Sequence, residues 1–393
     1  MNLRTNPAIS AVEAPPIAEA MTWLRPGPRN RPVINLCQAV PSYPPAEALQ
    51  EAIGRFAHED KVSLYTDILG LPELRESLAA HMNTAYGGKV AADDVAITAG
   101  CNQAFAAAVM ALAGPGDNVV LSAPYYFNHQ MWLDMLRVEV RHLPCRLPGL
   151  VPSPEDALKL IDARTRAIVL CSPNNPTGAI YPPATLAAFH DLACSQGTVL
   201  VLDETYKDFR TDIAPPHDLF ATDAWRDSFV QLYSFSKVFG MTGYRVGSLI
   251  AGPAVLKEVE KILDCVAICA PHISQAAAHF GLQNLDAWKA EKIAMIHGRA
   301  DALRSAFLRP DLAYRLESIG AFFAYVRHPF SGTPAKTVAQ HLAGEHDLLC
   351  LPGSMFGPGQ EDYLRLAFAN VDATVMPQVA ERLVDSQAML NRQ

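Results

Sequence analysis

The chain has 393 residues, of which 50% are hydrophobic and 18% are charged. This composition supplies a sizeable core and excludes a largely disordered chain. The net charge is −8 and no run of lysine or arginine occurs, which argues against nucleic acid as a partner. The sequence shows neither a secretion signal nor an apolar run of roughly 18 residues, so we expect a soluble cytoplasmic protein without a membrane partner.

The eight cysteines form neither a metal-binding pattern nor a disulfide pattern. The closest pair, Cys265 and Cys269, has helical spacing and no further Cys or His at the spacing of zinc sites. We therefore expect free cysteines in the core and no bound metal ion.

Short β-branched segments alternate with helix-like segments through the middle of the chain. The predicted strands are 94–100, 117–124, 166–173, 198–206, 229–236 and 246–252, and two helices between them are 101–113 and 183–197. Several strands are apolar on both faces, as in a sheet that is covered on both sides. The alternation predicts an α/β fold with a mostly parallel sheet sandwiched by helices, and an active site at the carboxyl ends of its strands.

The C-terminal part of the chain changes character. Strand-like and helix-like segments follow one another there over 311–329, 333–346, 348–357 and 372–392. They predict a smaller α+β domain, and we expect the proline-rich, loop-like residues 1–45 to pack against it. The predicted boundaries are 46–290 for the large domain, and 1–45 together with 291–393 for the small domain.

Two stretches that follow predicted strands are rich in turn residues. In "TAGCNQA" (98–104), the backbone N–H groups of Gly100, Cys101 and Asn102 could cradle an anion at the start of a helix. A simple tight turn is an equally good explanation of that stretch. "SPNNPTG" (172–178) taken alone indicates only a turn.

Two other strand ends carry charged residues in apolar surroundings. "VLDETY" (201–206) contains Asp203, whose carboxylate needs a cationic or donor partner, unless it simply caps a following helix. "SFSKVFGMTGYRVG" (234–247) contains Lys237 and Arg245 among serines and glycines. Because ionised lysine is almost never buried alone, this stretch predicts an anionic or covalent partner.

Together these segments carry a family pattern. The stretch with both cations matches S-x-S-K-x-x-G-x-x-G-x-R-x-G at all seven fixed positions. Beside it stand, in the family's order, "LYTDILGLPELR", "TAGCNQA", "NNPTG", "DETY", "GAFFAYV", "PGSMFG" and "YLRLAFA". The sequence thus resembles the class I and II aminotransferases of fold type I over nearly its whole length, and the resemblance implies a large domain that binds pyridoxal phosphate.

The resemblance implies pyridoxal 5′-phosphate as the cofactor, with Lys237 bonded to its aldehyde carbon. Burial beside a cation lowers the pKa of a lysine, which leaves its amine neutral and able to attack that carbon. Arg245 is implied to hold the phosphate group with its planar fork. The other implied phosphate donors are the hydroxyls of Ser234 and Ser236 and the backbone N–H groups of Gly100, Cys101 and Asn102.

The resemblance also implies how the cofactor ring is held. Asp203 matches the carboxylate that pairs with the ring nitrogen and keeps it protonated, so that the ring can accept electrons. Asn175 and Tyr206 match the donors to the phenolic oxygen. Tyr126 matches the aromatic residue that stacks on the ring, with Tyr125 as the alternative, and either could be a core residue instead. Asp203 and Tyr206 join the lysine as the implied catalytic residues.

The substrate and a partner subunit are implied by further matches. Arg365 matches the arginine that binds the substrate α-carboxylate with two prongs, and Asn175 and Ala39 are the other implied substrate contacts. Tyr65 matches the tyrosine that reaches the cofactor phosphate of the neighbouring subunit. The resemblance therefore implies a homodimer with shared active sites.

The sequence departs from the family around the substrate. In "NLCQAVPSYPP" (35–45), Ala39 and Val40 stand where the family usually has glycine, so the shape of the substrate pocket differs. In "APHISQ" (270–275) there is His272 but no arginine, whereas aspartate-specific members use a second arginine. His272 either contacts substrate or is a solvated or capping residue. We predict a neutral, aromatic or basic substrate rather than a dicarboxylic one.

The predicted function is an aminotransferase that moves an amino group between an L-amino acid and a 2-oxo acid. Another pyridoxal-phosphate enzyme of the same fold is the alternative, namely a C–S lyase, a synthase or an amino-acid oxidase. A transcription regulator with a sensor domain of this fold ranks last, because it needs an N-terminal helix-turn-helix module and only a short proline-rich arm precedes the predicted fold.

Overall fold

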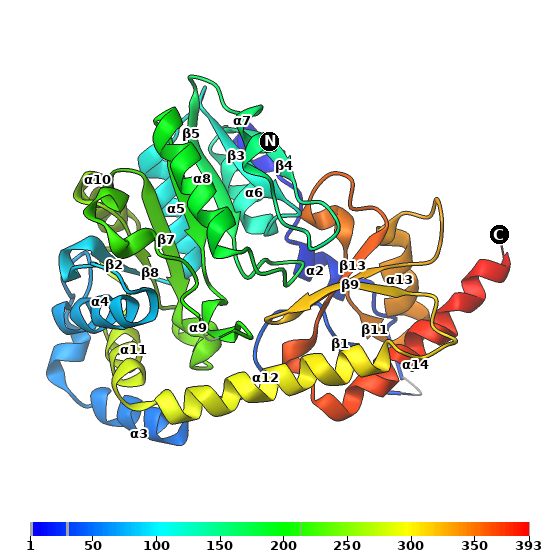
Figure 1. The fold of residues 1–393 in the computed structure, drawn as a ribbon. Helices are drawn as coiled ribbons and strands as arrows, with labels where there is room; N and C mark the ends of the chain where they lie inside the picture. Colours follow the sequence, from blue (N-terminus) through cyan, green and yellow to red (C-terminus); the bar gives the residue numbers. More distant parts are fainter. Residues whose placement is uncertain (1–2, 29–30, 213, 393) are drawn as a thin grey trace.

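The computed structural model describes residues 3–28, 31–212 and 214–392. Figure 1 shows a larger body around one sheet and a smaller body around another, with helix α12 (Asp286–Ala306) running along both. The predicted fold class is confirmed, because the large sheet is mostly parallel and flanked by helices. The domain boundary between 290 and 291 stays a prediction, and it falls inside α12.

The larger sheet has seven strands within the described residues, in the order β2-β8-β7-β6-β5-β3-β4. Strand β8 is antiparallel to both of its neighbours, and the other pairs are parallel. The bounds are β2 Val95–Thr98, β3 Asn118–Ala123, β4 Glu139–Pro144, β5 Thr165–Cys171, β6 Val199–Asp203, β7 Phe229–Ser234 and β8 Gly247–Ile250. The sequence pattern predicts all of them except β4, the edge strand beside β3.

Helices cover both faces of this sheet. Their bounds are α3 Glu47–Phe56, α4 Pro72–Tyr86, α5 Cys101–Leu112, α6 Phe127–Met135, α7 Pro154–Leu158, α8 Pro183–Gln196, α9 Phe235–Val238, α10 Pro253–Ala267 and α11 His272–Asn284. Ile168 and Leu200 pack into one apolar cluster with α8, whereas Val169 and Val201 pack into another with α5 and α10. Neighbouring residues of one strand are thus buried on opposite faces, which explains the continuous apolar runs.

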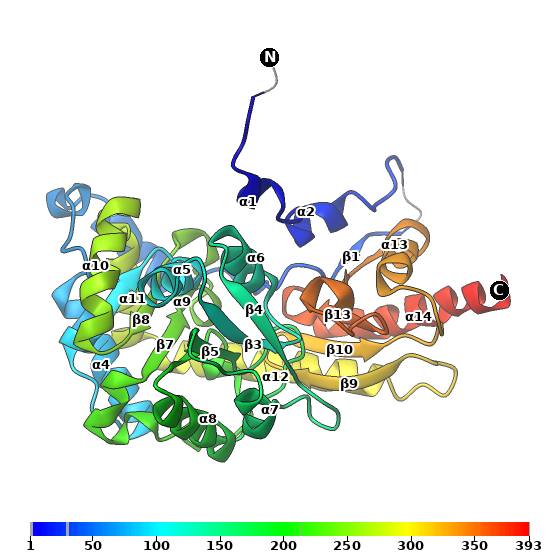
Figure 2. The same ribbon diagram turned by 90° about the horizontal axis from the view of Figure 1, so that it is seen from above.

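The smaller body contains an antiparallel sheet in the order β12-β13-β10-β9. Its elements are β9 Arg315–Gly320, β10 Phe323–Arg327, α13 Ala335–His346, β12 Leu351–Pro352, β13 Tyr363–Ala367 and α14 Met376–Ser386. Strand β1 (Ile34–Asn35) pairs in parallel with β11 (Leu348–Leu349), so the N-terminal segment lies against this body. That segment also forms α1 (Pro7–Ser10) and α2 (Pro16–Met21), seen above the sheets in Figure 2, where a loop was expected.

None of the helices in the described ranges has the length and hydrophobicity that crossing a membrane requires. All eight cysteines are free, as expected. Cys194 and Cys265 are exposed, and Cys269 is partly exposed. The expectation of core positions is therefore wrong for these three, because Cys194 and Cys265 face outward from α8 and α10, and Cys269 lies in the bend between α10 and α11.

Candidate active site

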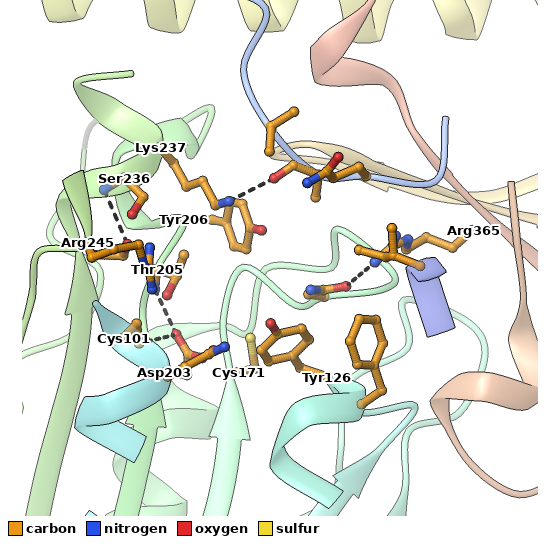
Figure 3. Close-up of a pocket in the computed structure, with 18 residues that line it drawn as sticks. Cys101, Tyr126, Cys171, Asp203, Thr205, Tyr206, Ser236, Lys237, Arg245 and Arg365 are labelled. Atoms are coloured by element: carbon orange, nitrogen blue, oxygen red, sulfur yellow. Dashed lines mark hydrogen bonds between the residues drawn. The ribbon is translucent and has the colours of Figure 1, made fainter. Parts of the chain in front are cut away.

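A cavity of about 210 Å³ lies at the carboxyl ends of strands β5, β6 and β7 (Figure 3). These strands are in register, so that Cys171 is paired with Asp203 and Asp203 with Leu232. The predicted site residues that line the cavity are Ala39, Cys101, Asn102, Tyr126, Asn175, Asp203, Tyr206, Ser234, Ser236, Lys237, Arg245 and Arg365. Segments far apart in sequence thus converge on one place, as the rule for open α/β sheets predicts.

The amine of Lys237 points into this cavity from α9, directly after β7 (Figure 3). Its Nζ donates a hydrogen bond to the carbonyl oxygen of Ala39 at 2.8 Å. Burial, and then the positive charges of Arg245 and Arg365, lower the pKa of Lys237 to about 8. The neutral, nucleophilic amine is therefore far more populated near neutral pH than that of an ordinary lysine.

Arg245 and the start of α5 form a cationic corner of the cavity. The guanidinium lies so close to Gly100 that a Cβ there would be 2.2 Å from Nη2, and Gly100 has a left-handed φ of +85°. Only glycine suits both conditions. The first N–H groups of α5 have no partner inside the helix, and the helix dipole favours an anion at this end. With the hydroxyls of Ser234 and Ser236, this corner fits a phosphate group.

Asp203 ends β6 and is buried at the floor of the cavity. Its Oδ2 accepts from Nε2 of His129 at 3.2 Å, and its Oδ1 accepts from the backbone N–H of Thr205 at 2.9 Å. The Sγ of Cys101 lies 3.7 Å from Oδ1. Burial raises the pKa of this carboxyl, but the hydrogen bonds and His129 outweigh burial and leave the pKa lowered. Asp203 is therefore an ionised group suited to a protonated ring nitrogen.

Arg365 lies on β13 at the side of the cavity formed by the smaller body, and only 1% of its surface is exposed. One of its Nη atoms donates to Oδ1 of Asn175 at 3.1 Å, and the other donates to the carbonyl oxygen of Cys37. Its Nε is buried without a hydrogen-bond partner. No carboxylate within the described residues pairs with it, so this buried cation offers charge and a free donor to an anionic ligand.

Three further predicted residues face the cavity. Tyr126 lines it, whereas Tyr125 does not and instead stacks on His142 with ring centroids 5.4 Å apart. Burial raises the pKa of Tyr206 well above its usual value, so its hydroxyl stays protonated and can donate. Asn175 accepts from arginine with its oxygen, which leaves its amide N–H groups free for another acceptor.

Tyr65 and His272 lie outside the cavity of a single chain. Tyr65 is 75% exposed. The Nδ1 of His272, the first residue of α11, is 3.3 Å from the carbonyl oxygen of Leu64. Gly243 lies within the short 3-10 turn Thr242–Tyr244, with open space around it and an ordinary φ, so that position does not require glycine.

Sequence reasoning missed several residues that shape the site. Ile17, Gln38 and Phe127 line the cavity, and His129 supports Asp203 from behind. A signal existed for His129, because it follows Tyr126 by about one helical turn and so shares its face of α6. No local signal places Ile17, since its helix starts within the proline-rich arm.

A model of the family described as "Aminotransferase class I and II" matches residues 31–383. The chain belongs to the class I and II aminotransferases. Enzymes of this family depend on pyridoxal phosphate, and this chain is accordingly a pyridoxal-phosphate-dependent aminotransferase.

This aminotransferase resembles proteins with different named substrates. It is 29% identical to an aromatic aminotransferase of Arabidopsis thaliana, over 89% of this chain and 88% of that protein. It is also 29% identical to an arginine–pyruvate transaminase of Pseudomonas aeruginosa, over 77% of each chain. The structure of an aspartate aminotransferase from Thermus thermophilus with maleate covers 98% of this chain and 100% of its own, with a TM-score of 0.88 and 24% identity. That last likeness shows the shared fold.

The residues present fit the cofactor of this aminotransferase family. The glycine beside Arg245 and the unpaired N–H groups of α5 suit its phosphate. The ionised Asp203 suits a protonated pyridine nitrogen, and the depressed pKa of Lys237 suits attack on an aldehyde. Each part of the cofactor thus has a chemically matched group in the cavity.

Proposed function

We propose that this aminotransferase exchanges an amino group between a neutral, aromatic or basic L-amino acid and a 2-oxo acid. Arg365 is the observation that carries the proposal. A buried guanidinium with an unpartnered Nε, across the cavity from Lys237, matches the α-carboxylate shared by amino acids and 2-oxo acids. The distance between carboxylate anchor and amine sets which substrate carbon faces the lysine.

The bound cofactor supplies an electron sink, which makes the Cα–H bond of the amino acid acidic. The chain's own residues then divide the work. Lys237 is the base that takes the proton from Cα and returns it one position further, and its lowered pKa matches that task. Asp203 would hold the ring nitrogen of the bound cofactor protonated, and Tyr206 and Asn175 would donate to its phenolic oxygen. Arg245 would anchor its phosphate.

The lining of the cavity supports a substrate without a second carboxylate. Ile17, Val40 and Phe127 are apolar, and within the described residues no cations other than the three already named line the cavity. A neighbouring cavity of about 390 Å³, which shares Phe127, is lined by Glu13 and Asp134 among others. Its negative charge disfavours a dicarboxylate and favours a neutral or basic side chain.

We also propose that the enzyme is a homodimer in which Tyr65 reaches the cofactor phosphate of the neighbouring subunit. Within one chain, Tyr65 is 75% exposed and Leu64 beside it is 66% exposed. Val266, at the end of α10, is 61% exposed. Large apolar side chains left this open support a surface that a second copy covers.

A half-reaction screen tests the substrate proposal. The holoenzyme is mixed with single amino acids, and absorbance follows conversion of the cofactor to its pyridoxamine form. Methionine, phenylalanine and arginine should convert it faster than aspartate, and amines that lack a carboxylate should be poor donors. Arg365→Lys, which keeps the charge but loses the fork, should reduce kcat/KM on the order of 30-fold to 1,000-fold. A clear preference for aspartate would refute the proposed pocket.

A further inference from the structure

Helix α12 carries a buried arginine that no ion pair explains. Arg299 is 4% exposed, and no salt bridge to it occurs within the described residues. Its guanidinium donates to the carbonyl oxygen of Ala369 through Nη1 and to Oγ of Ser42 through Nη2 at 2.7 Å. The Sδ of Met295 lies 3.3 Å from Nη2. These three acceptors are neutral.

A buried cation with neutral acceptors is costly to hold. Burial lowers the pKa of Arg299, and the negative charge of Asp372 compensates only in part. An apolar residue at this position would avoid the desolvation cost. The role of the two hydrogen bonds of Arg299 therefore lies in the segments that they connect, and not in the stability that they add.

Arg299 joins two segments that both border the substrate side of the cavity. Ser42 follows Ala39 and Val40 by a few residues, and Ala369 follows Arg365 by four. We name residues 36–42 the substrate loop. Strand β13 and the residues after it run beside this loop, and Arg299 contacts both from one guanidinium.

Backbone hydrogen bonds also connect the substrate loop to β13 and the residues after it. The N–H of Ala367 donates to the carbonyl oxygen of Leu36 at 2.8 Å, and the N–H of Ser42 donates to the carbonyl oxygen of Ala369 at 3.3 Å. Arg365 itself donates to the carbonyl oxygen of Cys37. The position of the Arg365 guanidinium is thus tied to the substrate loop, and the loop is tied to Arg299.

The same loop also reaches the lysine. Within the loop, the carbonyl oxygen of Ala39 accepts from Nζ of Lys237 at 2.8 Å, and directly after the loop the hydroxyl of Tyr43 donates to the backbone carbonyl of Lys237 at 2.9 Å. A shift of the loop would therefore change the separation between the amine and the carboxylate anchor. Such separations control kcat/KM, because about 1 Å of misplacement between the carboxylate anchor and the amine can cost on the order of 100-fold.

We propose that Arg299 is a positioning residue that clamps the substrate loop to the end of β13 and thereby fixes Arg365 relative to Lys237. This inference rests on the proposed role of Arg365 as the carboxylate anchor. Arg299 touches neither substrate nor cofactor, so its effect is on the binding of the carboxylate and not on the binding of the cofactor.

The chain offers a matched control. Arg382 on α14 is 3% exposed and likewise donates to neutral oxygens, here the backbone carbonyl oxygens of Asp347 at 2.6 Å and Pro32 at 2.8 Å. It lies outside the cavity lining. Arg299→Met and Arg382→Met therefore remove the same kind of buried group, and only the first should disturb the substrate loop.

Amide hydrogen exchange of the holoenzyme tests the clamp without any substrate. In Arg299→Met, we expect exchange over 36–45 and 365–370 to become about tenfold faster or more. In Arg382→Met, acceleration should be confined to the neighbourhood of residues 31–35 and 345–349. Ser42→Ala, which removes one acceptor from the surface of a loop, should give a smaller change over 36–45. If Arg299→Met does not fold, then Ser42→Ala and Arg299→Lys provide the test.

Kinetics with the best donor from the half-reaction screen complete the experiment. Arg299→Met should raise KM roughly tenfold, leave the affinity for pyridoxal phosphate unchanged and change kcat less than KM. Unchanged exchange of the loop, or an unchanged KM beside a normal control, would overturn the proposal. If no amino acid reacts at all, the proposed function fails, whereas the exchange result still decides whether the clamp exists.

Discussion

The amine of Lys237 is buried beside Arg245 and Arg365, and these surroundings explain its lowered pKa. The pKa of about 8 has burial as its first cause and Arg245 as its second. In protein freed of cofactor, labelling by an amine-reactive reagent should rise with pH and level off above about 8, because only the neutral amine reacts. Peptide mapping across a pH series measures this.

Removing the charge of Arg245 provides the control for that profile. In Arg245→Gln, one cause of the depression is gone, so the midpoint for Lys237 should move upward. A midpoint near the ordinary value of 10.5 in the unchanged protein would contradict the buried, cationic surroundings.

His129 is a second residue whose role is electrostatic. His129→Leu removes the donor at 3.2 Å from Asp203, so the pKa of that carboxyl should rise and its hold on a ring proton should weaken. We expect kcat to fall about tenfold, which corresponds to about 1.4 kcal/mol. Asp203→Asn should cost several kcal/mol in the same barrier. Kinetics and the pH titration of the cofactor's absorbance check both.

The control for His129 is His190→Leu, since His190 on α8 contacts Oγ of Ser228 at 2.9 Å, lies outside both cavities and should leave kcat nearly unchanged. Equal losses in the two histidine variants would mean that packing, rather than the bond to Asp203, is responsible.

The start of α5 requires glycine at position 100. In Gly100→Ala, the new methyl group would meet Arg245 at 2.2 Å and the backbone would keep an unfavourable φ. We expect the guanidinium to be displaced and the affinity for pyridoxal phosphate to fall at least tenfold, with about 1 kcal/mol lost in stability. Equilibrium dialysis and thermal unfolding measure the two effects separately.

Gly243→Ala is the matched change, because nothing lies within 4 Å of a Cβ there and its φ is ordinary. It should bind cofactor almost normally. Similar losses in both glycine variants would show that the spacing of glycines matters for folding and not for the phosphate corner.

Elements also show where sequence reasoning succeeds. Strands that are buried on both faces appear in the sequence as continuous apolar runs. Locating such a strand also locates the residue at its carboxyl end, such as Asp203. Strand β4 was missed because it is an edge strand with Glu139, Arg141 and His142, so its pattern resembles a loop. Arm helix α2 was missed because proline was taken as a loop signal, although proline is favoured in the first turn of a helix.

Contacts between distant segments were out of reach for a different reason. The position of Ile17 in the cavity lining and the hydrogen bond from Arg299 to Ser42 both depend on tertiary packing. The sequence around Ile17 and Arg299 contains no local pattern that predicts such contacts. The family resemblance supplied Arg365 and Tyr126, and the structure places both at the cavity. The resemblance did not contain the lining that comes from the N-terminal arm, such as Ile17.

At the scale of the whole molecule, mixing of two inactive variants tests whether the subunits share active sites. Tyr65→Ala and Lys237→Ala should each inactivate the enzyme, and mixing the two should restore part of the activity, because one site of a mixed dimer has both residues intact. Sedimentation shows whether dimers form, and tagged subunits show whether they mix. A monomeric enzyme, or inactive mixed dimers, would contradict a shared site.

The pairing of β1 with β11 has a consequence for how the protein is made. Ile34 cannot form its strand pairing until Leu348 has been synthesised, and the substrate loop cannot form its backbone hydrogen bonds until residues 365–370 have been synthesised. The strands of the large sheet, in contrast, all lie between residues 95 and 250. At ribosomal speeds the delay is on the order of tens of seconds. Lys237 and Asp203 can therefore be in place on a nascent chain whose carboxylate anchor has not yet been synthesised. The cofactor end of the site is completed first, and the substrate end is completed last.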